Sequence, residues 1–312
     1  MDYVNIGRTG LQVSRVCLGT NMFGAGYVDD DRALSVIDEA YDQGINFIDT
    51  ADAYHSGLSE SVVGRAVKGR RHDFVVGTKG FVPTGPGAND RGLSRAHLIE
   101  AVEASLRRLD TDYIDLYQVH YWDPETPVEE TLRTLDDLVH QGKIRYLGCS
   151  NFAAWHLGRA LWTSDKQGFE RFESVQPEYN FSRREIEREL IPLCLDRQVS
   201  VIPYQLLMGG VLTGGYQRQS GPPDDSHMAS RHVQRAKDTY WNETSFRMVD
   251  ELNALSAEAG YEPTQLVVAW ALSRPAVTSV IVGSSRPEQI VKNAEASTIK
   301  LSPEILGRLD AL

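Results

Sequence analysis

The stretch Gly44-Ile45-Asn46-Phe47-Ile48-Asp49-Thr50-Ala51-Asp52-Ala53-Tyr54 decides how this chain folds. It begins as a short apolar strand and ends in the carboxylate of Asp49, and Tyr54 follows five residues later. Two later apolar strands also end in ionisable side chains, Lys79 and His120. Consecutive strands that end in ionisable groups predict an active site at one rim of a parallel sheet.

The composition is that of an ordinary globular protein, with 312 residues of which 41% are hydrophobic and 24% charged. The net charge of -11 and the pI of about 5.2 argue against a broad nucleic-acid-binding surface, which needs a basic patch. Cys17, Cys149 and Cys194 form neither a CxxC pair nor a zinc-like spacing, so we expect buried apolar thiols and no metal.

No apolar run approaches the ~20 residues that a membrane helix needs. The first residues are polar and lack the apolar core of a signal peptide. We therefore expect a cytoplasmic protein that binds neither membranes nor nucleic acids.

From residue 15 onward, short apolar segments alternate with segments whose apolar residues recur at helical spacing. The predicted strands are 15–20, 45–48, 74–78, 113–119, 144–149, 173–176, 199–203 and 278–282. The predicted helices are 30–42, 59–68, 94–108, 127–140, 153–164, 183–196, 243–259, 263–273, 287–296 and 303–311. Ser59 and Ser94 are the expected N-caps of two of them.

Eight βα units of this size predict a parallel sheet, and in a chain of this length they favour a closed (β/α)8 barrel. Residues 2–14, with the turn signal Gly7-Arg8-Thr9-Gly10, predict an N-terminal hairpin. No composition shift marks a linker, so we expect a single domain over 1–312. The long segment 205–242 follows the seventh strand, and we interpret it as a flap over a ligand.

The side chains at the predicted rim have a combined chemical logic. An ammonium beside a phenol favours the phenolate, so Lys79 is expected to lower the pKa of Tyr54. Asp49 would keep Lys79 charged, and His120 would hydrogen-bond a substrate carbonyl. Tyr54 would then give a proton to a developing alkoxide. Each residue alone has an ordinary structural explanation, but their placement at three consecutive strand ends favours an active site.

Three motifs resemble those of the aldo-keto reductases, in the order in which that family has them. They are Ile48-Asp49-Thr50-Ala51-Asp52-Ala53-Tyr54, Leu109 through His120, and Gly142 through Phe152. The resemblance runs from about residue 3 to residue 310. Two later motifs, Gln176-Pro177-Glu178-Tyr179 and Leu212-Thr213-Gly214, resemble the branch that includes bacterial reductases and potassium-channel β subunits.

The resemblance implies a barrel closed at its bottom by the hairpin, and a reductase of aldehydes and ketones that uses NADPH or, less often, NADH. It implies that Tyr54 is the general acid/base, that Lys79 and Asp49 tune it, and that His120 orients the carbonyl. Arg286 lies just before a helix, where an arginine and the helix N-terminus favour a phosphate, so NADPH is expected.

The implied cofactor contacts have separate tasks. Ser150, Asn151 and Gln176 would hold the carboxamide, and Tyr204 would stack on the nicotinamide. Ser284 and Arg286 would face the 2′-phosphate, with Gln289 and Asn293 at the adenine. The complete set of expected contacts is Gly19, Thr20, Asn21, Asp49, Ser150, Asn151, Gln176, Tyr204, Gln205, Leu207, Gly209, Gly283, Ser284, Arg286, Gln289 and Asn293.

The chain departs from the family pattern at two places. Tyr204-Gln205-Leu206-Leu207 stands where relatives often have Tyr-Ser-Pro-Leu, and Asn21 stands where many have a tryptophan that lines the substrate pocket. The pocket should therefore differ from theirs. Its expected residues are Met22, Tyr54, Phe81, His120, Tyr121 and Trp122, with Phe23, Tyr27 and Trp241 as further candidates.

The leading interpretation is an NADPH-dependent carbonyl reductase with a small carbonyl or alcohol substrate, and the reverse oxidation of sugars or alcohols stays open. Lys79 at a barrel strand end also admits a Schiff-base aldolase. A third alternative is a cofactor-binding regulatory subunit with slow turnover, like the channel β subunits. The substrate, the choice between NADPH and NADH, and the oligomeric state stay open.

Overall fold

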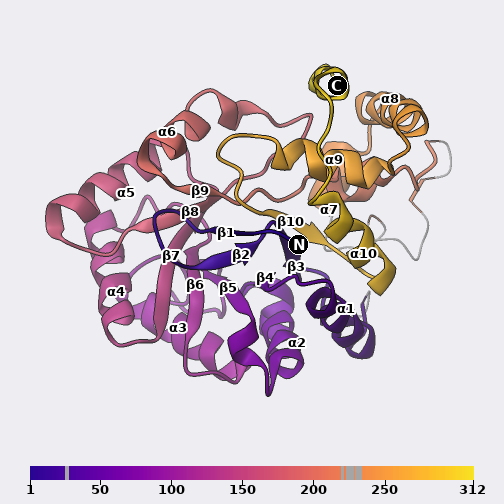
Figure 1. Ribbon diagram of the computed structural model, residues 1–312. Coiled ribbons are helices and arrows are strands. Elements are labelled where there is room, and N and C mark those ends of the chain that lie inside the picture. The colour runs from indigo at the N-terminus through magenta and orange to yellow at the C-terminus, as the bar shows by residue number, and fades with distance from the viewer. Residues whose placement is uncertain (25–27, 219–220, 223–227, 229–233) are drawn as a thin grey trace.

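Eight parallel strands form one sheet in the part of the chain that the computed structural model describes, which is residues 1–24, 28–218, 221–222, 228 and 234–312. Their order is β10-β3-β4-β5-β6-β7-β8-β9, and helices surround them (Figure 1). The strands are β3 (Val16–Gly19), β4 (Phe47–Asp49), β5 (Val75–Gly80), β6 (Ile114–Val119), β7 (Ile144–Ser150), β8 (Phe172–Gln176), β9 (Ser200–Val201) and β10 (Val280–Gly283).

Backbone hydrogen bonds join the two ends of this strand order. The Thr278 N–H donates to the carbonyl of Val201 at 3.0 Å, and the Ile281 N–H donates to the carbonyl of Pro203 at 2.9 Å. The sheet therefore curls back on itself, and the predicted (β/α)8 architecture is confirmed.

The N-terminal hairpin covers one end of the barrel. Strands β1 (Tyr3–Asn5) and β2 (Gln12–Ser14) pair antiparallel, and Ile6 and Val13 are fully buried. Both side chains pack in one apolar cluster with residues of the barrel strands and the segment after β9. Those residues are Cys17, Phe47, Val75, Leu116 and Ile202. Burial of this cluster explains why so short a hairpin holds its place.

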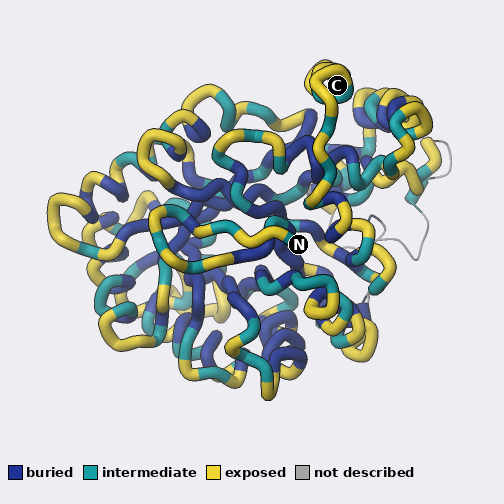
Figure 2. The backbone as a smooth tube through the Cα atoms, viewed as in Figure 1, coloured by how far each residue is buried: buried dark blue, intermediate teal, exposed yellow. Residues whose placement is uncertain are grey.

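The helices cover the outside of the sheet, and the buried residues gather at the centre of the molecule (Figure 2). In α4 the buried Val128, Leu132, Leu135 and Leu138 recur every three to four residues, which gives the helix one apolar face. The other helices are α1 (Asp30–Asp42), α2 (Leu58–Val67), α3 (Arg95–Leu109), α5 (Ala154–Gln167), α6 (Leu190–Arg197), α7 (Gln234–Tyr240), α8 (Glu243–Ala259), α9 (Pro263–Leu272), α10 (Pro287–Ala296) and α11 (Pro303–Asp310); α4 is Val128–His140.

Two predicted helix starts differ from the structure. The helix expected over 183–196 begins only at Leu190, because Pro192 lacks an N–H and is accommodated in a first turn. Ser59 is not an N-cap: Gly57, with φ 85°, precedes α2, and the Ser59 hydroxyl donates to the carbonyl of Thr20 at 2.8 Å. Ser94 does cap α3, as predicted.

The segment after β9 contains more regular structure than expected. A 3₁₀ turn covers Met208–Thr213, and α7 follows within the range 205–242. Part of this predicted flap lies outside the described residues, as does Tyr27.

Candidate active site

Strand register brings the predicted ionisable residues to one rim. Asp49 is the last residue of β4 and pairs with Gly77 of β5, so Lys79 lies two residues further along β5. The His120 N–H donates to the carbonyl of Gly80 at 3.1 Å, which fixes His120 just past β6. The carboxyl ends of parallel strands meet at one edge, so these side chains converge.

The Lys79 ammonium is the centre of this group. Its Nζ donates to Asp49 Oδ2 at 2.5 Å, to the carbonyl oxygen of Thr50 at 2.8 Å and to the Tyr54 hydroxyl at 3.2 Å. The lysine side chain is 0% exposed. An ammonium has three N–H bonds, and these three contacts use all of them. The Tyr54 oxygen accepts one of these bonds, so the Tyr54 hydroxyl can donate its own proton to another group.

The Asp49 carboxylate is fully hydrogen-bonded on its other oxygen. Oδ1 accepts from the side-chain amide of Gln118 at 3.0 Å and from that of Gln176 at 2.8 Å. Sequence reasoning missed Gln118, although its position two residues before His120 on the same strand face was a usable signal. These hydrogen bonds stabilise the buried negative charge of Asp49, whose burial without partners would cost free energy.

Burial and charge act in opposite directions on the two linked groups. Burial alone would lower the pKa of Lys79, but the Asp49 carboxylate and the Tyr54 oxygen outweigh it, and the pKa is raised. Burial raises the pKa of Tyr54, and the neighbouring Lys79 offsets this only in part. Lys79 does act to lower the pKa of Tyr54, but burial outweighs it, so the net shift is upward rather than downward as expected. Tyr54 therefore remains a protonated phenol at neutral pH.

His120 is neutral in this environment. Burial and the Lys79 charge lower its pKa to about 3. Its Nδ1 has no hydrogen-bond partner among the described residues, and the ring stacks on Tyr121 with centroids 5.0 Å apart. A neutral imidazole carries one N–H, so His120 is suited to donate a hydrogen bond without adding a charge.

A second buried carboxyl lies behind this group. Asp52 is 2% exposed, and neither of its carboxyl oxygens has a hydrogen-bond partner among the described residues. Burial and then the nearby Glu60 raise the pKa of Asp52 to about 7, although Arg108 and Lys79 act against them. Asp52 does not line the cavity described next, and it lies past the end of β4, where no sequence pattern distinguishes it from a surface carboxylate.

A cavity of about 640 Å³ opens at this rim and runs towards α10. Of the expected cofactor contacts, all except Ser284 line it. Of the expected pocket residues, Met22, Tyr54, His120 and Tyr121 line it, whereas Phe81 and Trp122 do not. Phe81 packs against Tyr121 instead, and Trp122 stacks on His156 with centroids 4.4 Å apart.

Two further pocket candidates lie elsewhere. Phe23 is 0% exposed and belongs to the hydrophobic core. Trp241 packs against Tyr216 and Phe246 rather than against the cavity.

Amide and hydroxyl groups form the wall near Asp49. The Tyr204 hydroxyl donates to Asn151 Oδ1 at 2.8 Å, and Asn151 Nδ2 donates to the carbonyl of His120 at 3.0 Å. The Ser150 hydroxyl donates to the carbonyl of Gln176 at 2.9 Å. These bonds fix the polar groups of this wall.

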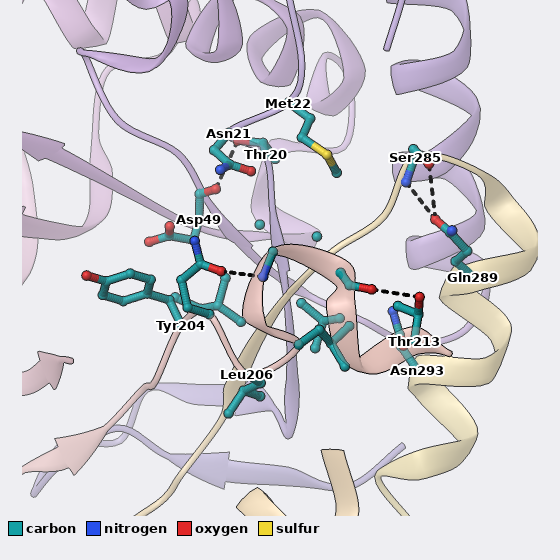
Figure 3. Close-up of a pocket in the computed structure, with 18 of the residues that line it drawn as sticks. Thr20, Asn21, Met22, Asp49, Tyr204, Leu206, Thr213, Ser285, Gln289 and Asn293 are labelled. Carbon is teal, nitrogen blue, oxygen red and sulfur yellow. Dashed lines mark hydrogen bonds between the residues drawn. The ribbon is translucent and has the colours of Figure 1, made fainter. Parts of the chain in front are cut away.

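The opposite end of the cavity is built around α10. Figure 3 shows Ser285, Gln289 and Asn293 there, well apart from Asp49 and Tyr204. Ser285 faces the cavity, while Ser284 is 0% exposed and accepts a hydrogen bond from Asn293 Nδ2 at 3.2 Å.

Several lining residues were not predicted, including Leu206 and Thr213, which lie inside quoted motifs. They are Leu206, Gly210, Thr213, Gly215, Tyr216, Glu262, Thr264, Ile281, Val282, Ser285 and Lys292. Two of them, Glu262 and Lys292, are charged.

The donor set of this elongated cavity fits a dinucleotide. One end offers fixed amides and hydroxyls beside a phenol and an imidazole, and the other offers Arg286 and Lys292 at the start and on the side of a helix. Cations and a helix N-terminus suit phosphate. Among the described residues, no group of three or more His, Cys, Asp or Glu side chains is arranged to hold a metal ion. No described helix is both long and apolar enough to cross a membrane.

Comparison with known proteins agrees with this geometry. Residues 15–312 match the model of the aldo/keto reductase family, and the chain belongs to that family. It is 35% identical to a probable voltage-gated potassium channel subunit beta of Arabidopsis thaliana over 316 residues, which cover 99% of this chain and 96% of that protein.

Two relatives carry enzyme names. An uncharacterized oxidoreductase of Bacillus subtilis is 36% identical over 321 residues, covering 99% of this chain and 95% of that protein. The versiconal hemiacetal acetate reductase of Aspergillus parasiticus is 36% identical over 335 residues, covering 99% of this chain and 96% of that protein.

Proposed function

We propose that this protein is an NADPH-dependent oxidoreductase that reduces an aldehyde or ketone to an alcohol, with Tyr54 as the proton donor. The observation that carries the proposal is the set of three hydrogen bonds from Lys79 to Asp49, Thr50 and Tyr54. A bound nicotinamide dinucleotide would supply the hydride. The relatives with reductase and oxidoreductase names support the same class of reaction.

The side chains at the rim divide the remaining work. His120 donates a hydrogen bond to the carbonyl oxygen, which orients it and stabilises the charge that develops there. Tyr54, kept protonated by burial, delivers its proton to that oxygen. Lys79 stabilises the phenolate that remains, because its ammonium is held within 3.2 Å of the Tyr54 oxygen.

The same geometry argues against a Schiff-base aldolase. A lysine nucleophile must be neutral and accessible, but Lys79 is fully buried and its pKa is raised. Its three N–H bonds are all used.

A regulatory subunit that binds the cofactor and turns over slowly is the second candidate. The observation in its favour is the 35% identity to a protein named as a probable potassium channel subunit beta. A high affinity for NADPH, with no turnover of any carbonyl in a broad panel, would favour this alternative.

We also infer that residues 1–312 work as one domain. Residues from near both ends of the chain, such as Gly19 and Asn293, line the same cavity.

The test is a panel of aldehydes, ketones and alcohols with NADPH and NADH, followed at the nicotinamide absorbance. Tyr54→Phe should lower kcat by roughly 10²- to 10⁴-fold, because the proton donor is lost. Titration with NADPH should give nearly the same affinity as the unchanged protein. Tyr41→Phe removes a hydroxyl from an exposed position on α1 and serves as the matched control. Near-normal turnover by Tyr54→Phe would refute the assignment of the acid.

A further inference from the structure

An ion pair lies in the wall of the cavity at the α10 end. Lys292 Nζ lies 2.6 Å from Glu262 Oε1, and both residues line the cavity. Their side chains are 46% and 50% exposed, so a ligand reaches both without displacing packed residues. Neither residue has a part in the chemistry proposed for the rim.

The backbone of Glu262, the carboxylate residue of this pair, is held in place at the start of α9. Glu262 immediately precedes α9, and its backbone N–H donates to Gln265 Oε1 at 3.0 Å. Lys292 lies on α10 next to Asn293, which also lines the cavity. Helices α9 and α10 pack against each other. The pair therefore links the two helices across this end of the cavity.

The charges at this end act in opposite ways on the two dinucleotides. Arg286 and Lys292 attract a 2′-phosphate, whereas Glu262 repels it and also occupies Lys292. An unphosphorylated ribose has no such conflict, because a carboxylate accepts a hydrogen bond from a ribose hydroxyl.

We propose that the Glu262–Lys292 pair sets the selectivity between NADPH and NADH: it stays closed beside a 2′-hydroxyl and must open for Lys292 to meet a 2′-phosphate. Glu262 thereby limits the preference for NADPH that Arg286 and Lys292 would otherwise impose. This inference rests on the proposed dinucleotide-dependent function, and it assigns the residues that decide which dinucleotide is used.

The experiment measures binding rather than turnover. NADPH and NADH are titrated separately into the full chain, and the fluorescence of the reduced nicotinamide gives each dissociation constant. Glu262→Gln should raise the ratio of NADPH affinity to NADH affinity by roughly two- to fivefold, the range expected for a half-exposed charge pair. Lys292→Met should lower that ratio by a similar factor.

Two further measurements test the mechanism. If Glu262 acts through Lys292, the effect of Glu262→Gln becomes much smaller in the Lys292→Met background, because the two changes are coupled. The effect should also shrink at high salt, which screens exposed charges.

Glu295→Gln is the matched control. Glu295 is also a carboxylate on α10, it accepts a hydrogen bond from Gln265 Nε2 at 3.1 Å, and it is not among the residues that line the cavity. Its removal changes the net charge by the same amount and should leave the ratio unchanged. An equal rise of the affinity ratio in Glu295→Gln would mean that the change in net charge causes the effect, and it would overturn the inference.

The two levels of the proposal fail in different ways. If the unchanged protein binds neither dinucleotide, the proposed function is wrong and this inference falls with it. If it binds at least one and Glu262→Gln leaves the ratio unchanged, only the selectivity role is overturned.

Discussion

The two ends of the cavity are built in opposite ways. At the rim, the side chains of Lys79 and Asp49 are 0% and 3% exposed, and all of their strong hydrogen-bonding capacity is used inside the protein. At the α10 end, the charged pair of Lys292 and Glu262 is about half exposed. Buried charges with fixed partners are suited to catalysis, whereas exposed charges are suited to discrimination between similar ligands.

The difference follows from the elements that carry the residues. Asp49 and Lys79 lie on the neighbouring barrel strands β4 and β5, whose register fixes their spacing. Arg286 and Lys292 lie at the start and on the side of a surface helix, where water competes with every contact. Changes at the rim should therefore have large effects on stability and rate, and changes at the α10 end should have small and selective ones.

The largest effect is expected for Lys79→Met. The change leaves the Asp49 carboxylate buried without its partner, which should lower the free energy of unfolding by about 3–5 kcal/mol and abolish turnover. Chemical denaturation and the carbonyl panel measure the two losses. The double variant Lys79→Met/Asp49→Asn should regain part of the stability but none of the activity. If Lys79→Met alone is as stable as the unchanged protein, the proposed contrast between the buried rim and the exposed α10 end is wrong.

Asp52→Asn should have a smaller effect that depends on pH. The fold raises the pKa of Asp52 from about 3.9 to about 7, so the folded state favours its protonated form. The stability that the folded state gains from protonated Asp52 is complete below about pH 4 and is lost as the pH rises to about 7. Relative to the unchanged protein, Asp52→Asn should therefore gain on the order of 2 to 4 kcal/mol between pH 4 and pH 8. Denaturation at the two pH values measures it, and an equal difference at both would contradict the shift.

The smallest and most selective of these effects is expected for Arg286→Met. Loss of one exposed charge-assisted contact should weaken NADPH binding by roughly tenfold and leave NADH binding nearly unchanged. The same fluorescence titration measures both. Arg308→Met, which removes a guanidinium outside the cavity, is the control. An equal loss for both dinucleotides would mean that Arg286 does not face the 2′-phosphate.

Much of this molecule was predictable because its periodicity is strong and local. The alternation of short apolar strands with amphipathic helices predicted the barrel, and the ionisable residues at three strand ends predicted the rim. The helix boundaries around Ser59 and Pro192 were less predictable, because local capping and backbone geometry decided them.

The residues that line the cavity were predictable only in part. Met22 and Tyr121 line it as expected, whereas Phe81 and Trp122 pack against other rings. Side-chain direction on a loop depends on what the loop packs against, and no sequence pattern carries that information.

The sequence by itself determined the parallel barrel, its hairpin, and which residues end at the rim, because strand periodicity and chain order impose these features. Only the tertiary structure decided that all three Lys79 N–H bonds are used, that burial outweighs Lys79 in setting the pKa of Tyr54, and that Glu262 meets Lys292 across two helices. Desolvation and contacts between distant segments control those properties, and both arise only when the chain is packed.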